Sequence, residues 1–170
     1  MFSNQVIAMS ASKPSLSTRE RAIPYAARGA AGGVRGGASI EHYLHAASAL
    51  ERDHMVREGF EPGSLDAFAH RFGRSGRSLA QLLGVAPATY DRRVREGKPL
   101  SQDDSDRVAR LIDVERAATR VFGDEAAARE WLGTPIPALG GAIPIELLVT
   151  TPGHQAVMNA LRRIMAGTAA

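Results

Sequence analysis

The stretch FGDEAAAREWLGTPIPALGGAIPIELLVTTPGHQAVMNALRRIMAG, residues 122–167, decides the fold of this 170-residue chain. It contains the single tryptophan, Trp131, and a close succession of helix start and stop signals. Asp124 precedes an alanine-rich run, and Gly133 and Pro135 end that run. No set of side chains within the stretch has a catalytic spacing. The stretch therefore predicts a small helical binding module.

The last helix of this module is expected to start at Thr151 as its cap, with Pro152 in its first position. Val157, Leu161, Ile164 and Met165 then form an apolar stripe. We interpret Trp131 as the hydrophobic anchor of the module, because a buried indole contributes at most roughly 4–6 kcal/mol at about 25 cal/mol per Å².

The composition of the whole chain is that of a globular protein. Hydrophobic residues make up 44% of the chain, which is enough for a core, and there is no cysteine for a disulfide or a thiolate metal site. No apolar run is long enough for a membrane span or a secretory signal, so a cytoplasmic protein is expected. Arginine supplies 19 of the 21 basic residues and suits contacts with anionic partners.

Residues 1–38 differ from the rest of the chain. Ser, Ala and Gly dominate there, and five glycines fall between positions 29 and 37. A phosphate-binding loop would need a preceding strand and a following GK[ST] signature, and neither is present. We expect a flexible N-terminal arm.

Apolar residues recur every three or four positions from Ser39 to about Gly59, which predicts one amphipathic helix. His42 and His45 lie three residues apart on it, a spacing that two metal ligands can have. No third ligand is evident, so we expect ordinary surface histidines and no metal site.

Several short helices separated by glycines are expected over residues 64–97. The segment LAQLLGVAPATYDRRVREG, residues 79–97, contains a small residue at Ala80, a turn glycine at Gly84 and a helix-starting proline at Pro87. It resembles the Xre-like helix-turn-helix of bacterial repressors.

The resemblance implies that the second helix of this motif faces the major groove of DNA. Two departures weaken it: Ala86 stands where a capping side chain is usual, and Arg93 stands where an apolar residue is usual. The alternative is a helical bundle with a solvated arginine face. The predicted DNA contacts are Arg77, Thr89, Arg92, Arg93 and Lys98.

Ser101 and Asp104 form a capping pattern that predicts a longer helix, which Gly123 ends. Its apolar residues fall on one face and are expected in the core. The charged residues between them are interpreted as a solvated face: Asp106, Arg107, Arg110, Asp113, Glu115, Arg116 and Arg120.

A second resemblance extends over about residues 64–167 and is most specific in the C-terminal half. It rests on these residues in order: Phe122-Gly123-Asp124, Trp131-Leu132, Pro135, Leu139-Gly140, Pro144, Glu146-Leu147-Leu148, Gly153, Val157, Leu161 and Gly167. This series is similar to the C-terminal toxin-binding domain of the MbcA/ParS/Xre antitoxins.

The resemblance implies an all-α protein with a helix-turn-helix and dimerisation region at 39–100 and a toxin-binding domain at 101–170. Such an antitoxin sterically blocks a RES-domain toxin, an enzyme that consumes NAD or transfers ADP-ribose from it. The antitoxin itself is not an enzyme and needs no cofactor. It forms a homodimer within a larger complex and represses its own operon by binding operator DNA.

The toxin contacts are expected on the outer face of the last helix and on the tail. They are Asn159, Arg162, Arg163, Gly167, Thr168, Ala169 and Ala170. The alternative function is a stand-alone helix-turn-helix repressor without a toxin partner.

Overall fold

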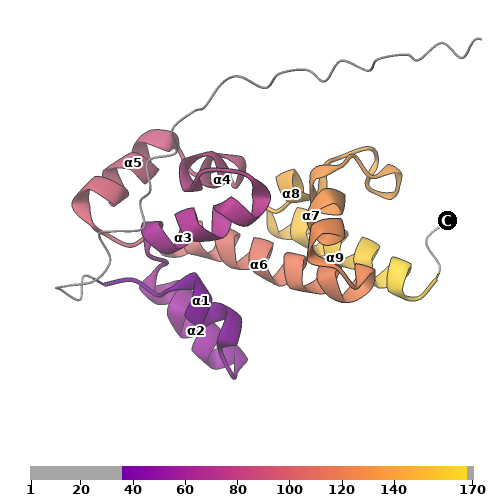
Figure 1. Ribbon diagram of the computed structural model, residues 1–170, viewed down its shortest axis with the longest axis horizontal. Helices are drawn as coiled ribbons and strands as arrows, with labels where there is room; N and C mark the ends of the chain where they lie inside the picture. The colour runs from indigo at the N-terminus through magenta and orange to yellow at the C-terminus, as the bar shows by residue number, and fades with distance from the viewer. Residues whose placement is uncertain (1–35, 168–170) are drawn as a thin grey trace, which may run out of the picture. The chain divides into compact units, whose positions relative to one another are not determined.

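The computed structural model describes residues 36–167, and every regular element in that range is helical (Figure 1). This confirms the prediction of an all-α fold. The helices are α1 (Ile40–His45), α2 (Ala49–Glu58), α3 (Pro62–Ala69), α4 (Gly76–Leu82), α5 (Pro87–Glu96), α6 (Gln102–Phe122), α7 (Glu125–Gly133), α8 (Pro144–Leu147) and α9 (Thr151–Met165). Short 3-10 segments lie at His70–Phe72 and Pro137–Leu139.

The 21-residue helix α6 organises the fold. It packs against α2, α7 and α9, while α3 packs against α1, α4 and α5. Figure 1 shows α3, α4 and α5 near the start of α6, and α7 to α9 near its end. The helix-turn-helix segment and the C-terminal segment therefore share α6 as a common support.

Local capping sets the limits of α6 and α7. The Ser101 hydroxyl accepts a hydrogen bond from the Asp104 amide at 3.2 Å, and the Asp124 carboxylate accepts one from the Ala127 amide at 2.7 Å. Gly123 ends α6 in the left-handed conformation, which glycine adopts without a steric cost. The predicted start and end of this helix are confirmed.

The prediction of a single helix over Ser39–Gly59 is wrong, because the chain breaks between α1 and α2. The Ser48 hydroxyl accepts a hydrogen bond from the Glu51 amide at 3.1 Å, and the Glu51 carboxylate accepts one from the Ala47 amide at 2.8 Å. These two hydrogen bonds start a new helix in a variant of the capping box, in which Glu51 binds the amide of the residue before the N-cap. Leu50 is consequently 78% exposed and does not belong to the apolar stripe.

The same kind of shift affects α9. Its N-cap is Thr150, one residue earlier than predicted, and the Thr150 hydroxyl accepts a hydrogen bond from the Gly153 amide at 3.1 Å. Thr151 therefore occupies the first helical turn.

One hydrophobic core runs through the described residues on both sides of α6. Its fully buried leucines are Leu65, Leu79, Leu83, Leu111, Leu132, Leu148 and Leu161. Trp131 is only half-buried, with its ring centroid 5.8 Å from that of Phe122. Trp131 therefore packs against the core as expected, but it is not fully buried, and its neighbour Leu132 occupies the inward position.

Candidate partner-binding surfaces

Helices α4 and α5 form a close helix-turn-helix. Gly84 makes the turn with a φ of 81°, and Ala80 is fully buried. Gly76 lets the helices approach, since a Cβ at this position would lie 2.3 Å from the Tyr90 hydroxyl oxygen. That hydroxyl donates a hydrogen bond to the Pro62 carbonyl at 3.1 Å, which fixes α5 against the start of α3.

The predicted DNA contacts on α5 differ in exposure. Arg92 is exposed and Thr89 is half-buried. Arg93 is also half-buried, and its Nε is buried without a hydrogen-bond partner among the described residues. Arg93 follows the buried Tyr90 by three positions and so lies on the same side of the helix. Arg93 is therefore only partly accessible to DNA, and its role as a DNA contact stays a prediction.

The two predicted contacts outside α5 are engaged in surface ion pairs. Arg77 Nε lies 3.0 Å from each carboxylate oxygen of Asp91, which joins α4 to α5. Lys98 Nζ lies 3.1 Å from Glu96, and the hydrogen bond from Lys98 lowers the pKa of the Glu96 carboxyl. Exposed pairs of this kind contribute little to stability, so both cations can exchange partners at low cost.

The outer face of helix α9 is polar, except that Met165 near its end, expected in the apolar stripe, is 63% exposed. Asn159, Arg162 and Arg163 are all exposed, and Arg162 Nη1 donates a hydrogen bond to the Asn159 side-chain oxygen at 2.8 Å. Gly167 is exposed at the end of the helix. The remaining predicted toxin contacts, residues 168–170, lie outside the described residues.

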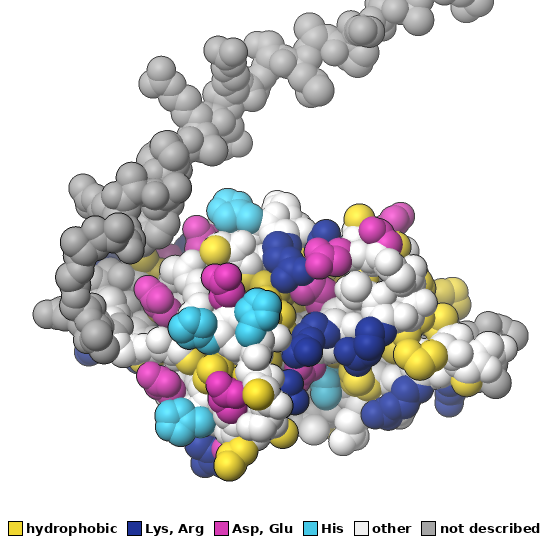
Figure 2. Space-filling model, turned by 60° about the horizontal axis from the view of Figure 1, so that its bottom comes forward, with side chains coloured by type: hydrophobic (Ala, Val, Ile, Leu, Met, Phe, Trp, Pro, Cys, Tyr) yellow, Lys and Arg dark blue, Asp and Glu magenta, His cyan; other side chains and the backbone are white. Residues whose placement is uncertain are grey.

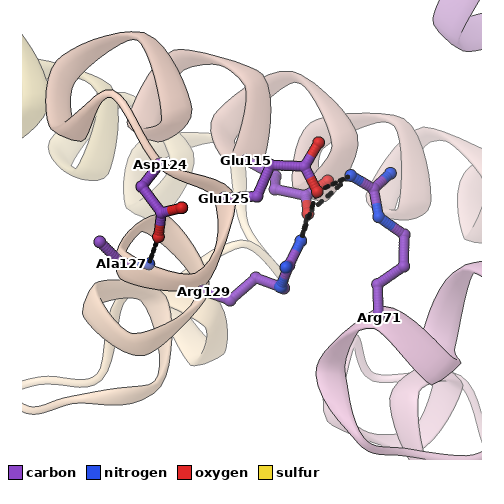
Figure 3. Close-up of polar contacts among 6 residues, drawn as sticks. All are labelled: Arg71, Glu115, Asp124, Glu125, Ala127 and Arg129. Atoms are coloured by element: carbon purple, nitrogen blue, oxygen red, sulfur yellow. Dashed lines mark hydrogen bonds and ion pairs between the residues drawn. The ribbon is translucent and has the colours of Figure 1, made fainter.

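An ion cluster around one buried carboxylate joins the consecutive helices α6 and α7 to the His70–Phe72 segment, which lies far from them in the sequence (Figure 3). Glu115 of α6 is only 2% exposed and lies 3.2 Å from Arg129 Nη1 of α7 and 3.4 Å from Arg71 Nη2 of the His70–Phe72 segment. Both arginines also pair with Glu125, at 3.0 and 3.1 Å. The interpretation of Glu115 as part of a solvated face is wrong.

The pKa values of the two glutamates in this cluster shift in opposite directions. Burial raises the pKa of the Glu115 carboxyl, although the two guanidinium groups act in the opposite direction. Hydrogen bonds from the same arginines lower the pKa of Glu125, which is exposed. A signal for burial was present in the sequence, because Glu115 follows Leu111 by four positions and precedes Ala118 by three on the apolar side of α6.

The fold and these surfaces define a class: an all-helical protein with a helix-turn-helix and a second helical module. Within residues 36–167, no three His, Asp or Glu side chains come together in a group suited to a metal ion. None of the helices in that range is long and apolar enough to cross a membrane.

Comparisons with known proteins identify the family within this class. The antitoxin Xre-like helix-turn-helix domain model matches residues 51–113, and the antitoxin Xre/MbcA/ParS C-terminal toxin-binding domain model matches residues 117–167. The chain is 30% identical over 133 residues to the Prs ADP-ribosylating antitoxin of Sphingobium sp. strain YBL2, covering 73% of this chain and 84% of that protein. It is 36% identical over 113 residues to antitoxin Xre of Yersinia enterocolitica, covering 66% and 76%.

A third relative is antitoxin Xre of Photorhabdus laumondii, 33% identical over 97 residues, which cover 56% of this chain and 64% of that protein. The chain belongs to the Xre/MbcA/ParS antitoxin family. Its partner is a toxin, which the C-terminal domain binds. Because antitoxins regulate by binding, the prediction that the chain is not an enzyme is confirmed by its family.

Proposed function

We propose that this antitoxin neutralises a RES-domain toxin, which consumes NAD or transfers ADP-ribose from it, by covering the active site of the toxin. The observation that carries the proposal is the polar outer face of α9, with Arg162 and Arg163 exposed within the segment that the toxin-binding model matches. The name of the Sphingobium relative connects that protein to ADP-ribosylation and supports this class of toxin.

Neutralisation in this proposal is steric. The guanidinium groups of Arg162 and Arg163, together with the Asn159 amide, form hydrogen bonds and ion pairs with carboxylates at the rim of the toxin cleft. The tail from Gly167 through Thr168, Ala169 and Ala170 has small side chains and extends the contact. The antitoxin supplies no reacting group.

The proposed domain organisation is an arm at 1–38, of which residues 1–35 lie outside the described residues, a helix-turn-helix and dimerisation region at 39–100 and a toxin-binding domain at 101–170. The working complex contains a homodimer of this chain and resides in the cytoplasm with the toxin.

The test of toxin binding is co-expression with the cognate toxin and measurement of growth and complex affinity. Reversing the charge at Arg162 with Arg162→Glu is expected to weaken the complex about 100-fold or more, because a charged contact becomes repulsive. Arg57→Glu on α2 is the matched control, since Arg57 is also an exposed helical arginine. If both variants protect growth equally, the toxin contact does not lie on the outer face of α9.

We also propose that the antitoxin represses its own operon through α5. Arg92 is the exposed contact to a base or phosphate, and Arg77 and Lys98 neutralise phosphates after exchanging Asp91 and Glu96 for DNA. The half-buried Thr89 and Arg93 orient the helix and contribute their outer atoms.

Arg92→Ala is the cleaner test of DNA binding, because Arg93 also has a packing role. If Arg92 contacts a phosphate, the plot of log affinity against log salt concentration should become shallower by about one unit. Arg57→Ala is the control. If Arg92→Ala binds operator DNA with unchanged affinity and salt dependence, α5 is not the helix that contacts DNA.

The alternative is a stand-alone repressor that acts through the helix-turn-helix alone. It predicts operator binding by the isolated chain and no toxin in a pull-down of the chain from its native cells. Recovery of a RES-domain protein in that pull-down distinguishes the antitoxin from this alternative.

A further inference from the structure

A cleft of about 340 Å³ opens between α1, the His70–Phe72 segment, the second half of α6 and the start of α7. Its charged lining includes Arg71, Arg116 and Arg120, the two glutamates of the ion cluster and His45. This volume falls at the lower end of the range of about 300–1,000 Å³ for sites that hold small molecules. Neither proposed binding surface, on α5 or on α9, uses it.

The positive charge in the cleft exceeds the negative charge. Glu115 and Glu125 are already matched by Arg71 and Arg129, with the four distances between 3.0 and 3.4 Å. Arg116 and Arg120, in contrast, form no hydrogen bond or ion pair with any other described residue.

These two arginines are four positions apart on α6, so they project from the same side of the helix. His45 adds a nitrogen donor from α1. Figure 2 shows Lys and Arg side chains near the middle of the face that it draws, next to Asp, Glu and His side chains.

We propose that this cleft binds a small polyanion through Arg71, Arg116 and Arg120. Several phosphoryl or carboxylate oxygens on one small molecule would match three guanidinium groups that converge on one cleft. A DNA duplex needs a broad, continuous basic surface, and Glu115 and Glu125, which line the same cleft as these arginines, oppose it.

An anion bound in the cleft would compete for Arg71 of the ion cluster. Arg71 holds both Glu115 and the exposed Glu125, and the side chain of Glu125 is 56% exposed, so an anion in the cleft competes with Glu125 for Arg71. Removing the Glu125 charge should therefore strengthen anion binding, whereas removing the Arg120 charge should weaken it.

The experiment is calorimetric titration of the full chain with sodium pyrophosphate and, separately, with sodium citrate, at ionic strength matched with sodium chloride. Binding of either probe by the unmodified chain is expected, and the stronger one identifies the oxygen chemistry. Arg120→Gln should weaken it about tenfold, through loss of one charge-assisted contact, and Glu125→Gln should strengthen it.

Arg57→Gln is the charge-matched control and should bind as the unmodified chain does. The circular dichroism spectrum establishes that each variant is folded; Arg120 is exposed, so its replacement leaves the core intact. The proposal is overturned if neither probe binds, or if Arg120→Gln and Arg57→Gln change the affinity equally, which is the result of non-specific attraction to a basic protein.

Discussion

A methyl group added at Gly153 tests how closely α8 holds the start of α9. An ideal Cβ at Gly153 would lie 2.0 Å from the carbonyl oxygen of Leu147 and 2.9 Å from its carbonyl carbon. Both are backbone atoms, so no side-chain rotation relieves the contact. The variant Gly153→Ala can fold only if the two helices move apart.

Three effects set the magnitude. Alanine in place of glycine favours a helix by up to about 1 kcal/mol. Overpacking against a rigid neighbour costs about 1–3 kcal/mol, and displacement of Gly153 weakens the cap from Thr150, which contributes about 1 kcal/mol. We expect a net loss of about 1–3 kcal/mol in the free energy of unfolding, or roughly 2–12 °C in Tm.

Gly133→Ala is the matched control in the same half of the protein. Gly133 is also helical, its φ is outside the left-handed region, and a Cβ there would meet no atom within 4 Å. This variant should gain up to about 1 kcal/mol. Thermal unfolding followed by circular dichroism measures both, and a Tm for Gly153→Ala equal to or above that of the unmodified chain would refute the argument.

Three further changes test the packing around α6 and α9. Ser105→Ala should cost about 1–3 kcal/mol in urea unfolding, because the buried amide of Phe60 loses its acceptor at 2.9 Å. Burial lowers the pKa of His154 in the folded protein below its ordinary 6.5, so folding favours the neutral imidazole. This contribution to the free energy of unfolding is fully present above pH 6.5 and is lost as the pH falls through the folded pKa. Between pH 7 and 5 the unmodified chain should therefore lose more stability than His154→Gln, and equal losses would contradict this. Trp131→Ala should cost about 2 kcal/mol, less than for a fully buried tryptophan, because the indole is only partly buried against the core and its aromatic contact is Phe122. Unfolding calorimetry measures this loss, and complete loss of folding would contradict the expected value.

The sequence predicts those parts of the fold that depend on nearby residues. Ser101 and Asp124 were identifiable as caps because their hydrogen bonds reach only three residues ahead. Ser48 was missed, although its bond has the same reach, because the apolar pattern appeared to continue through it. Periodicity alone therefore overestimates the length of a helix when a cap lies within the pattern.

On the candidate surfaces, too, the sequence predicts the exposure of some residues and not of others. The outward positions of Arg92 and Arg162 follow from helical spacing, whereas the partial burial of Arg93 depends on how α5 packs around Tyr90. Glu115 is the clearest example, because its partners Arg71 and Arg129 lie 44 and 14 positions away and only the tertiary fold brings them together.

The position of Glu115 also indicates a structural role for the ion cluster. Glu115 lies between the segments matched by the two family models, while Arg71 lies in the first segment and Arg129 in the second. A buried ion cluster seldom adds much stability, because desolvation offsets the attraction, and burial does raise the pKa of Glu115. What the cluster does restrict is rotation: α6 cannot turn about its axis without breaking a contact on one side or the other. We infer that Glu115 holds the two segments in one relative orientation, and that Glu115→Gln should change their relative mobility in hydrogen exchange more than it changes the free energy of unfolding.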